Sequence, residues 1–124
     1  MFLLAKMDVG MTPPIEYHHT ASEITLGEAL TLETDELSKC AATTKPDYVA
    51  VGPKDANGMV PCIKVQAYMI FDTIFQASAA SLHLGDKVTL HTDGLQVTAT
   101  VSSGVATIIH MDGTGVGDHV QVRF

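Results

Sequence analysis

The chain has 124 residues, of which 46% are hydrophobic, and its 7 Lys and Arg against 14 Asp and Glu give a formal net charge of −7 at pH 7. This length suits one domain with its own core, since a chain of this size buries roughly two thirds of its unfolded surface. The acidic balance argues against a nucleic-acid partner and against anionic membranes. Phosphate groups need clustered cations, and the few cations here are scattered along the sequence.

The first 22 residues differ in character from the rest. Gly10, Pro13 and Pro14 interrupt any helix, and Pro13 favours extended geometry at the residue before it. The opening MFLLAKMD is too short for the apolar part of a signal peptide, and no other apolar run approaches a membrane span. We therefore expect a protein that is made and kept in the cytosol, unless it leaves as part of a larger particle.

This N-terminal segment predicts an extended arm over residues 1–23, followed by a single β domain over residues 24–124. The arm is too apolar for a freely solvated tail. Two interpretations stay open: the arm packs on a neighbouring subunit or a larger surface, or it lies over its own domain and covers a sheet edge. The residues that we expect to bind a partner are Phe2, Leu3, Leu4, Met7, Val9, Met11, Pro13, Pro14, Ile15 and Tyr17.

A twelve-residue unit occurs twice in the chain. Leu26–Leu37 (LGEALTLETDEL) and Leu84–Leu95 (LGDKVTLHTDGL) align without a gap and share seven of twelve positions, and Gly117–Val122 (GDHVQV) is a partial third copy. Each full copy predicts a turn at Gly and the following acid, then an alternating strand, then a turn at Thr-Asp. Gly27 and Gly85 should therefore occupy equivalent turns that need a positive φ.

The middle of the chain predicts a hairpin, a short strand and a long strand. The hairpin has its turn at residues 34–36, and the short apolar strand covers residues 48–51, before the strong loop signal of residues 52–58. Cys62–Phe75 is the longest predicted strand, with Ile63, Val65, Ala67, Met69 and Phe71 on one face. A helix is the competing interpretation, and a break of the strand near Asp72 stays open.

The C-terminal part predicts four consecutive antiparallel strands. The Asp93-Gly94 pair between two alternating runs is a strong hairpin signal, because a primed turn needs positive φ. The predicted strands are Lys87–His91, Leu95–Val101, Val105–His110 and His119–Phe124. Many short strands with almost no helical periodicity indicate an all-β fold, either a small antiparallel β-barrel or a sandwich.

The sequence contains no pattern typical of a catalytic or metal site. The six histidines lack HxH or HxxxH spacing, and the serines lack the strand-turn-helix context of a nucleophile. The stretch from Gly113 to Gly117 has neither the Lys nor the helix of a phosphate loop. Cys40 and Cys62 have no metal-ligand spacing, which leaves two reduced thiols or one disulfide. We expect no enzyme activity, no cofactor and no metal.

Two stretches resemble the small head decoration proteins of tailed bacteriophages. They are Ala41–Val49 (AATTKPDYV), taken with the Leu-Gly-acid strand before it, and Gly117–Phe124 (GDHVQVRF). The resemblance is one of layout: an N-terminal arm, short strands with Gly-Asp turns, and a final strand. It covers most of the chain from Ile24 onward.

The resemblance implies a virion protein on the capsid exterior, made in the host cytoplasm. It would bind the assembled major capsid protein as a trimer at a local three-fold position and stabilise the shell. The arm would supply part of the contact by adding an extended segment to a sheet edge. The alternatives are another phage structural subunit, of the tail tube or of head completion, and a small β-barrel module that binds a ligand or a metal through His83, His91, His110 or His119.

Overall fold

The computed structural model describes residues 1–7 and 13–124, and within them it contains strands, turns and loops without a helix. The all-β prediction is confirmed. No segment of the described residues is a helix long and apolar enough to cross a membrane. The strands are β1 (Leu3–Met7), β2 (Ile15–His19), β3 (Ala29–Glu33), β4 (Glu36–Lys39), β5 (Tyr48–Ala50), β6 (Met59–Lys64), β7 (Met69–Ile74), β8 (Lys87–Val88), β9 (Ala106–Met111) and β10 (His119–Arg123).

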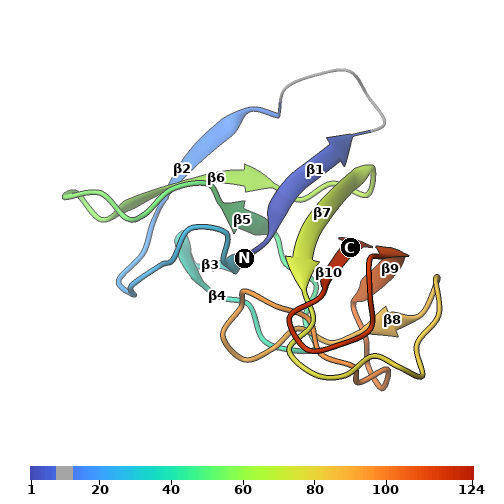
Figure 1. Cartoon of the computed structure of the whole chain (residues 1–124). Helices are drawn as coiled ribbons and strands as arrows, with labels where there is room; N and C mark the ends of the chain where they lie inside the picture. Colours follow the sequence, from blue (N-terminus) through green and yellow to red (C-terminus); the bar gives the residue numbers. More distant parts are fainter. Residues whose placement is uncertain (8–12) are drawn as a thin grey trace.

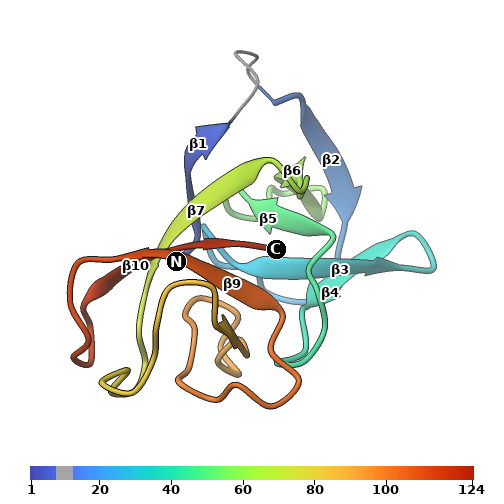
Figure 2. The same cartoon turned by 90° about the vertical axis from the view of Figure 1, so that its right-hand side faces the viewer.

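These strands form two five-stranded sheets. One is an open sheet in the order β1-β7-β10-β9-β8, and the other closes into a barrel in the order β2-β4-β3-β5-β6. The pairs are antiparallel apart from β2 and β4, which meet in parallel at His19 and Glu36. The barrel and the open sheet lie against each other, and the chain crosses from one to the other between β6 and β7 (Figures 1 and 2).

The wall between the two cores is made by strands whose two faces are both buried. In β3, Ala29 belongs to the larger core cluster of the open sheet, whereas Leu30 belongs to the smaller cluster inside the barrel. In β5, Val49 faces the larger cluster and Tyr48 and Ala50 face the smaller one. Successive side chains of a strand point to opposite faces, so a strand between two cores loses its polar alternation. This explains the continuous apolar run at β5.

The prediction of one long strand over Cys62–Phe75 is wrong. β6 ends at Lys64, and a turn follows in which the N–H of Met69 donates to the carbonyl of Gln66 over 3.1 Å. β7 then begins in the other sheet. The period-two pattern continues through both strands, so hydrophobicity alone does not mark the point where the chain changes sheets.

The predicted strand Leu95–Val101 is present only as an irregular hairpin. Val97 forms isolated bridges with Leu90 and Phe75, while Thr89 and Thr98 share a backbone hydrogen bond of 3.0 Å. At the tip, Gly94 has a φ of +72°. The hairpin prediction is therefore confirmed in its pairing, but not as two regular strands.

The repeated Gly-acid pairs form turns with one shared hydrogen-bond pattern. The N–H of Gly27 donates to the carbonyl of Ala50 over 2.8 Å, and the N–H of Glu28 donates to the carbonyl of Thr25 over 3.0 Å. In the second copy, the N–H of Gly85 donates to the carbonyl of Ile108, and the N–H of Asp86 donates to the carbonyl of His83. In the third copy, Gly117 donates to Phe75 and Asp118 donates to Gly115 in the same way. The three glycines have φ values of +79°, +92° and +84°, which confirms the predicted positive φ at Gly27 and Gly85.

The acid of each pair also accepts a hydrogen bond from the backbone three residues earlier. Asp86 Oδ2 accepts from the N–H of His83 over 2.9 Å, and Asp118 Oδ2 accepts from the N–H of Gly115 over 2.8 Å. Glu28 makes the corresponding backbone bond at Thr25. The short side chain of Asp favours such local bonds in turns, which accounts for Asp86 and Asp118 at these positions.

The described residues of the predicted arm are extended and run along the domain as part of its sheets. β1 pairs with β7 at an edge of the open sheet, and β2 pairs with β6 in the barrel. This arrangement corresponds to the interpretation in which the segment covers its own domain. Division of the chain into an arm and a domain at residue 24 stays a prediction.

Candidate partner-binding surface

Some residues predicted to bind a partner are instead used by the chain itself. The side chain of Phe2 is 1% exposed, and its ring lies 5.5 Å from the ring of Phe124. The Phe2 N–H donates to the carbonyl of Gly27 over 2.8 Å. Leu4 and Met7 are half-buried against the same core cluster. Phe2 therefore offers no side-chain surface to a partner, because it is already in the core.

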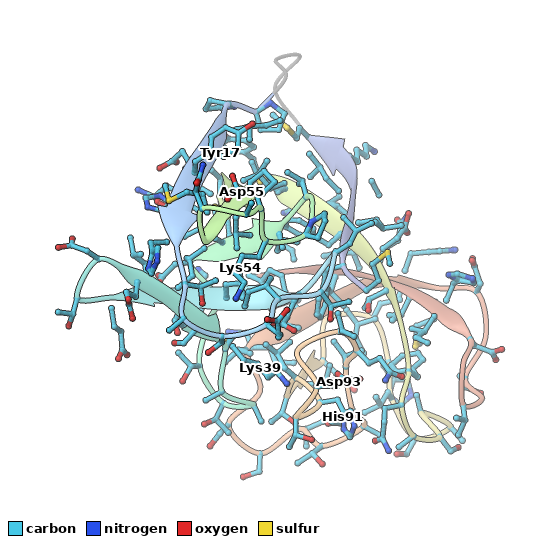
Figure 3. All side chains as sticks on the ribbon, turned by 90° about the vertical axis from the view of Figure 1, so that its left-hand side faces the viewer. Tyr17, Lys39, Lys54, Asp55, His91 and Asp93 are labelled. Carbon is cyan, nitrogen blue, oxygen red and sulfur yellow. The ribbon has the colours of Figure 1, made fainter. Side chains whose placement is uncertain are left out.

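Three large apolar or aromatic side chains among the predicted residues remain exposed. Leu3 on β1 is 49% exposed, and Ile15 and Tyr17 on β2 are 54% and 60% exposed. We call these three residues the β1–β2 set. Pro14 is exposed and Pro13 is half-buried, whereas Val9 and Met11 lie outside the described residues. β1 runs from the middle of the molecule toward the end where β2 begins (Figure 1), and Figure 3 shows Tyr17 at that end, away from Asp93 and His91.

The exposure of Ile15 and Tyr17 follows from the geometry of β2. This strand pairs with β6 along its full length, from Ile15 opposite Ile63 to His19 opposite Met59. Alternate residues of a strand point to the same face, so Ile15 and Tyr17 both point away from the barrel. A strand that is paired along its length holds such side chains in fixed positions.

The inward face of β2 is held by a small polar network. The hydroxyl of Tyr48 donates to Glu16 Oε1 over 3.0 Å, and His18 Nε2 lies 3.1 Å from the same oxygen. The His18 and Tyr48 rings are 4.9 Å apart. The hydrogen bonds from His18 and then Tyr48 lower the pKa of Glu16, while burial, followed by Glu16, raises the pKa of Tyr48 to about 12. This network fixes β2 against β5.

Beside β1, a small apolar hollow opens on the surface. Its volume is about 170 Å³, and its lining includes Met1, Leu3, Ile74 and His119. β1 is the last strand of the open sheet, so one side of its backbone has no strand partner among the described residues. Such an edge can accept a further extended segment.

The geometry of the described residues does not support a metal site. No group of three or more His, Cys, Asp or Glu side chains within residues 1–7 and 13–124 could hold a metal ion. The histidine and acid pairs that occur are local, such as His110 with Asp112 at 2.9 Å and His19 with Glu36 at 3.1 Å. The four histidines His83, His91, His110 and His119 therefore do not form a described ligand cluster.

One cluster of cationic side chains was not predicted from the sequence. Lys45, Lys87 and Arg123 are far apart in the chain, and the fold places all three around a single surface groove. The expectation of scattered cations thus holds along the sequence but not in space. The cluster depends on the pairing of β8, β9 and β10, and no local sequence motif predicts that pairing.

Comparison with known proteins identifies the fold. No family model matches the chain, and no curated protein matches it by sequence. The crystal structure of the N base of the head fiber protein gp8.5 of bacteriophage phi29 is similar, with a TM-score of 0.64 and 20% sequence identity. The match covers 91% of this chain and 94% of the phi29 chain. The two chains share one fold over nearly their whole lengths.

Proposed function

We propose that the chain is a structural protein of a phage head, which binds the outer surface of the assembled capsid and stabilises it as a decoration protein. The observation that carries this proposal is the fold shared with the N base of the phi29 head fiber over almost the full length of both chains. The resemblance of Ala41–Val49 and Gly117–Phe124 to decoration proteins points to the same class. In this role the protein catalyses no reaction and needs no cofactor.

The β1–β2 set is the proposed contact with the capsid. Ile15 and Tyr17 are apolar or aromatic side chains that a regular strand holds in the solvent, so docking would order little that is not already ordered. Aromatic residues are enriched among those that dominate binding energy. The partner in this proposal is the major capsid protein, and the protein binds it as a homotrimer at a local three-fold position.

A binding experiment with matched variants tests the contact. Heads from a phage whose copy of this gene is disrupted would be mixed with purified protein and sedimented. The double variant Ile15→Ser with Tyr17→Ser should bind roughly tenfold more weakly, because a central aromatic contact is typically worth more than 1 kcal/mol. The control is Val101→Ser with Val116→Ser, which removes two apolar side chains that are 56% and 70% exposed elsewhere. Equal binding by both double variants would contradict the proposed surface.

The alternative functions give different observations. A tail-tube or head-completion subunit would occupy the tail or a single vertex, whereas a decoration protein would occupy many equivalent positions on the shell. A metal-binding module would contain a stoichiometric metal after purification, which elemental analysis detects. Sedimentation velocity of the purified protein, free and released from heads, tests the trimer.

A further inference from the structure

A row of three side chains crosses the open sheet at its β8 end. Lys87 on β8 and Arg123 on β10 are both paired with Thr107 on the central strand β9. Directly paired residues of neighbouring strands project to the same face of a sheet. Strands lie about 4.8 Å apart, so the backbones at Lys87 and Arg123 are separated by about 10 Å, with the Thr107 hydroxyl between them.

This row forms the floor of a surface groove. The groove has a volume of about 450 Å³, and its other lining residues are Lys45, Gly104, Val105, Ile109 and Phe124. Lys45 belongs to the loop between β4 and β5, so it approaches the sheet from the barrel. Gly104 is required here, because a Cβ at this position would overlap the backbone carbonyl of Lys87.

The charge of the groove is opposite to that of the protein. Three of the seven cations of the chain line it, and its described lining residues include no Asp or Glu. The protein as a whole has a formal net charge of −7. Like charges that are gathered in one hollow repel each other, and their combined potential attracts anions to that place. A positive groove in an acidic protein is therefore suited to an anionic partner.

The shape and lining favour a polypeptide over a small inorganic anion. Val105, Ile109 and the ring of Phe124 supply apolar surface between the cations. Small phosphate sites typically use the backbone N–H groups of a helix N-terminus, and the described residues form no helix. The two lysines are flexible point charges that suit separate carboxylates.

We propose that this groove binds an acidic polypeptide segment of a partner protein, with its carboxylates paired to Lys45 and Lys87 and its apolar side chains over Val105 and Ile109. In the open sheet, β8 forms the edge opposite to β1, and Figure 1 shows it far from β2. The groove is thus separate from the β1–β2 set, and its function does not depend on the proposed capsid contact.

The test uses the whole protein and a fluorescent synthetic peptide that alternates Glu with Leu, with a peptide that alternates Gln with Leu as its neutral counterpart. Fluorescence anisotropy should show binding of the Glu peptide only. Lys87→Gln and Lys45→Gln should each weaken it about threefold to fivefold, the range of a partly exposed ion pair. The control Lys64→Gln removes an exposed lysine from the end of β6 in the barrel and should leave the affinity unchanged.

Further measurements keep the outcome clear. Each variant should melt at the temperature of the parent, and amide chemical shifts should change at β8, β9 and β10 when the peptide binds. Thr107→Val keeps the shape of the side chain but removes its hydroxyl. It serves as the test variant if Lys87→Gln proves unstable. Equal weakening by Lys64→Gln, binding of the Gln peptide, or displacement of the Glu peptide by inorganic phosphate at the same total charge would overturn the proposal.

Discussion

Gly27 and Gly85 occupy the same turn in two parts of the fold. Their φ angles are +79° and +92°, and each donates its N–H over 2.8 Å to the carbonyl of a partner strand. The residue that accepts this bond donates its own N–H to the backbone carbonyl of the residue after the glycine, from Ala50 to Glu28 and from Ile108 to Asp86. The repeat seen in the sequence is therefore a repeat of backbone structure that fixes where β3 and β8 begin.

Substitution of these two glycines should reveal both their shared conformation and their different surroundings. Gly85→Ala should destabilise by about 1 kcal/mol, since its positive φ disfavours a side chain and its Cβ would meet open space. Gly27→Ala should cost more, because its Cβ would overlap the side chain of Met1. Urea unfolding of both variants measures the difference. Two variants as stable as the parent would contradict the shared turn.

The N-terminal strand should behave as part of the domain. Phe2→Ala removes a fully buried ring and should destabilise by about 3–5 kcal/mol. Leu3→Ala, one residue along the same strand, removes a side chain that is 49% exposed and should change stability by about 0.5 kcal/mol or less. Chemical unfolding of the pair checks this contrast. Equal and small effects would indicate that the segment is not packed in solution.

Glu28 is expected to make stability depend on pH. The residue is 3% exposed, and its Oε2 is buried without a hydrogen-bond partner among the described residues. Burial raises its pKa above the ordinary 4.5, against the opposing effect of Lys39. The stability associated with its protonated form is therefore complete below about pH 4.5 and is lost as the pH rises through the folded-state pKa.

Glu28→Gln removes this loss and should melt at a higher temperature than the parent at neutral pH. The gain should shrink as the pH falls toward 4.5, where the parent is protonated as well. Thermal melts of both proteins across this range give the answer. A difference that stays constant with pH would show that the charge at Glu28 is not its cause.

Cys40 and Cys62 should be inert in the folded protein. Both thiols are free and buried, in different core clusters. Burial raises the pKa of each thiol to about 12. The groups therefore stay protonated, and a protonated thiol reacts much more slowly than a thiolate. A thiol reagent at mildly alkaline pH should detect neither cysteine until denaturant is added, and then both. Rapid reaction of the native protein would contradict their burial.

Local chemistry made part of this structure predictable. The Gly-acid turns, the hairpins and the all-β class follow from residue types at short spacing, and the structure contains them. The turn between Lys64 and Met69 was missed because alternation continues on both sides of it. The cations around Thr107 were missed because Lys87 and Arg123 meet through strand pairing across a large part of the chain. Long-range register is the information that the sequence patterns do not carry.

The residues of the candidate site were also only partly predictable from the sequence. The apolar composition of the first residues drew attention to Leu3, Ile15 and Tyr17, which are exposed. It did not separate them from Phe2, because burial depends on the position of β1 at the edge of the open sheet and on the ring of Phe124.

The central claim is that this protein covers the outside of a phage head. Cryo-electron microscopy of heads from the parent phage and from a phage that lacks the gene tests it directly. If the protein decorates the head, the parent shell shows additional density at many equivalent positions on its outer surface, with the β1–β2 set toward the capsid. Shells that are identical in the two maps, or extra density at a single vertex alone, would contradict it.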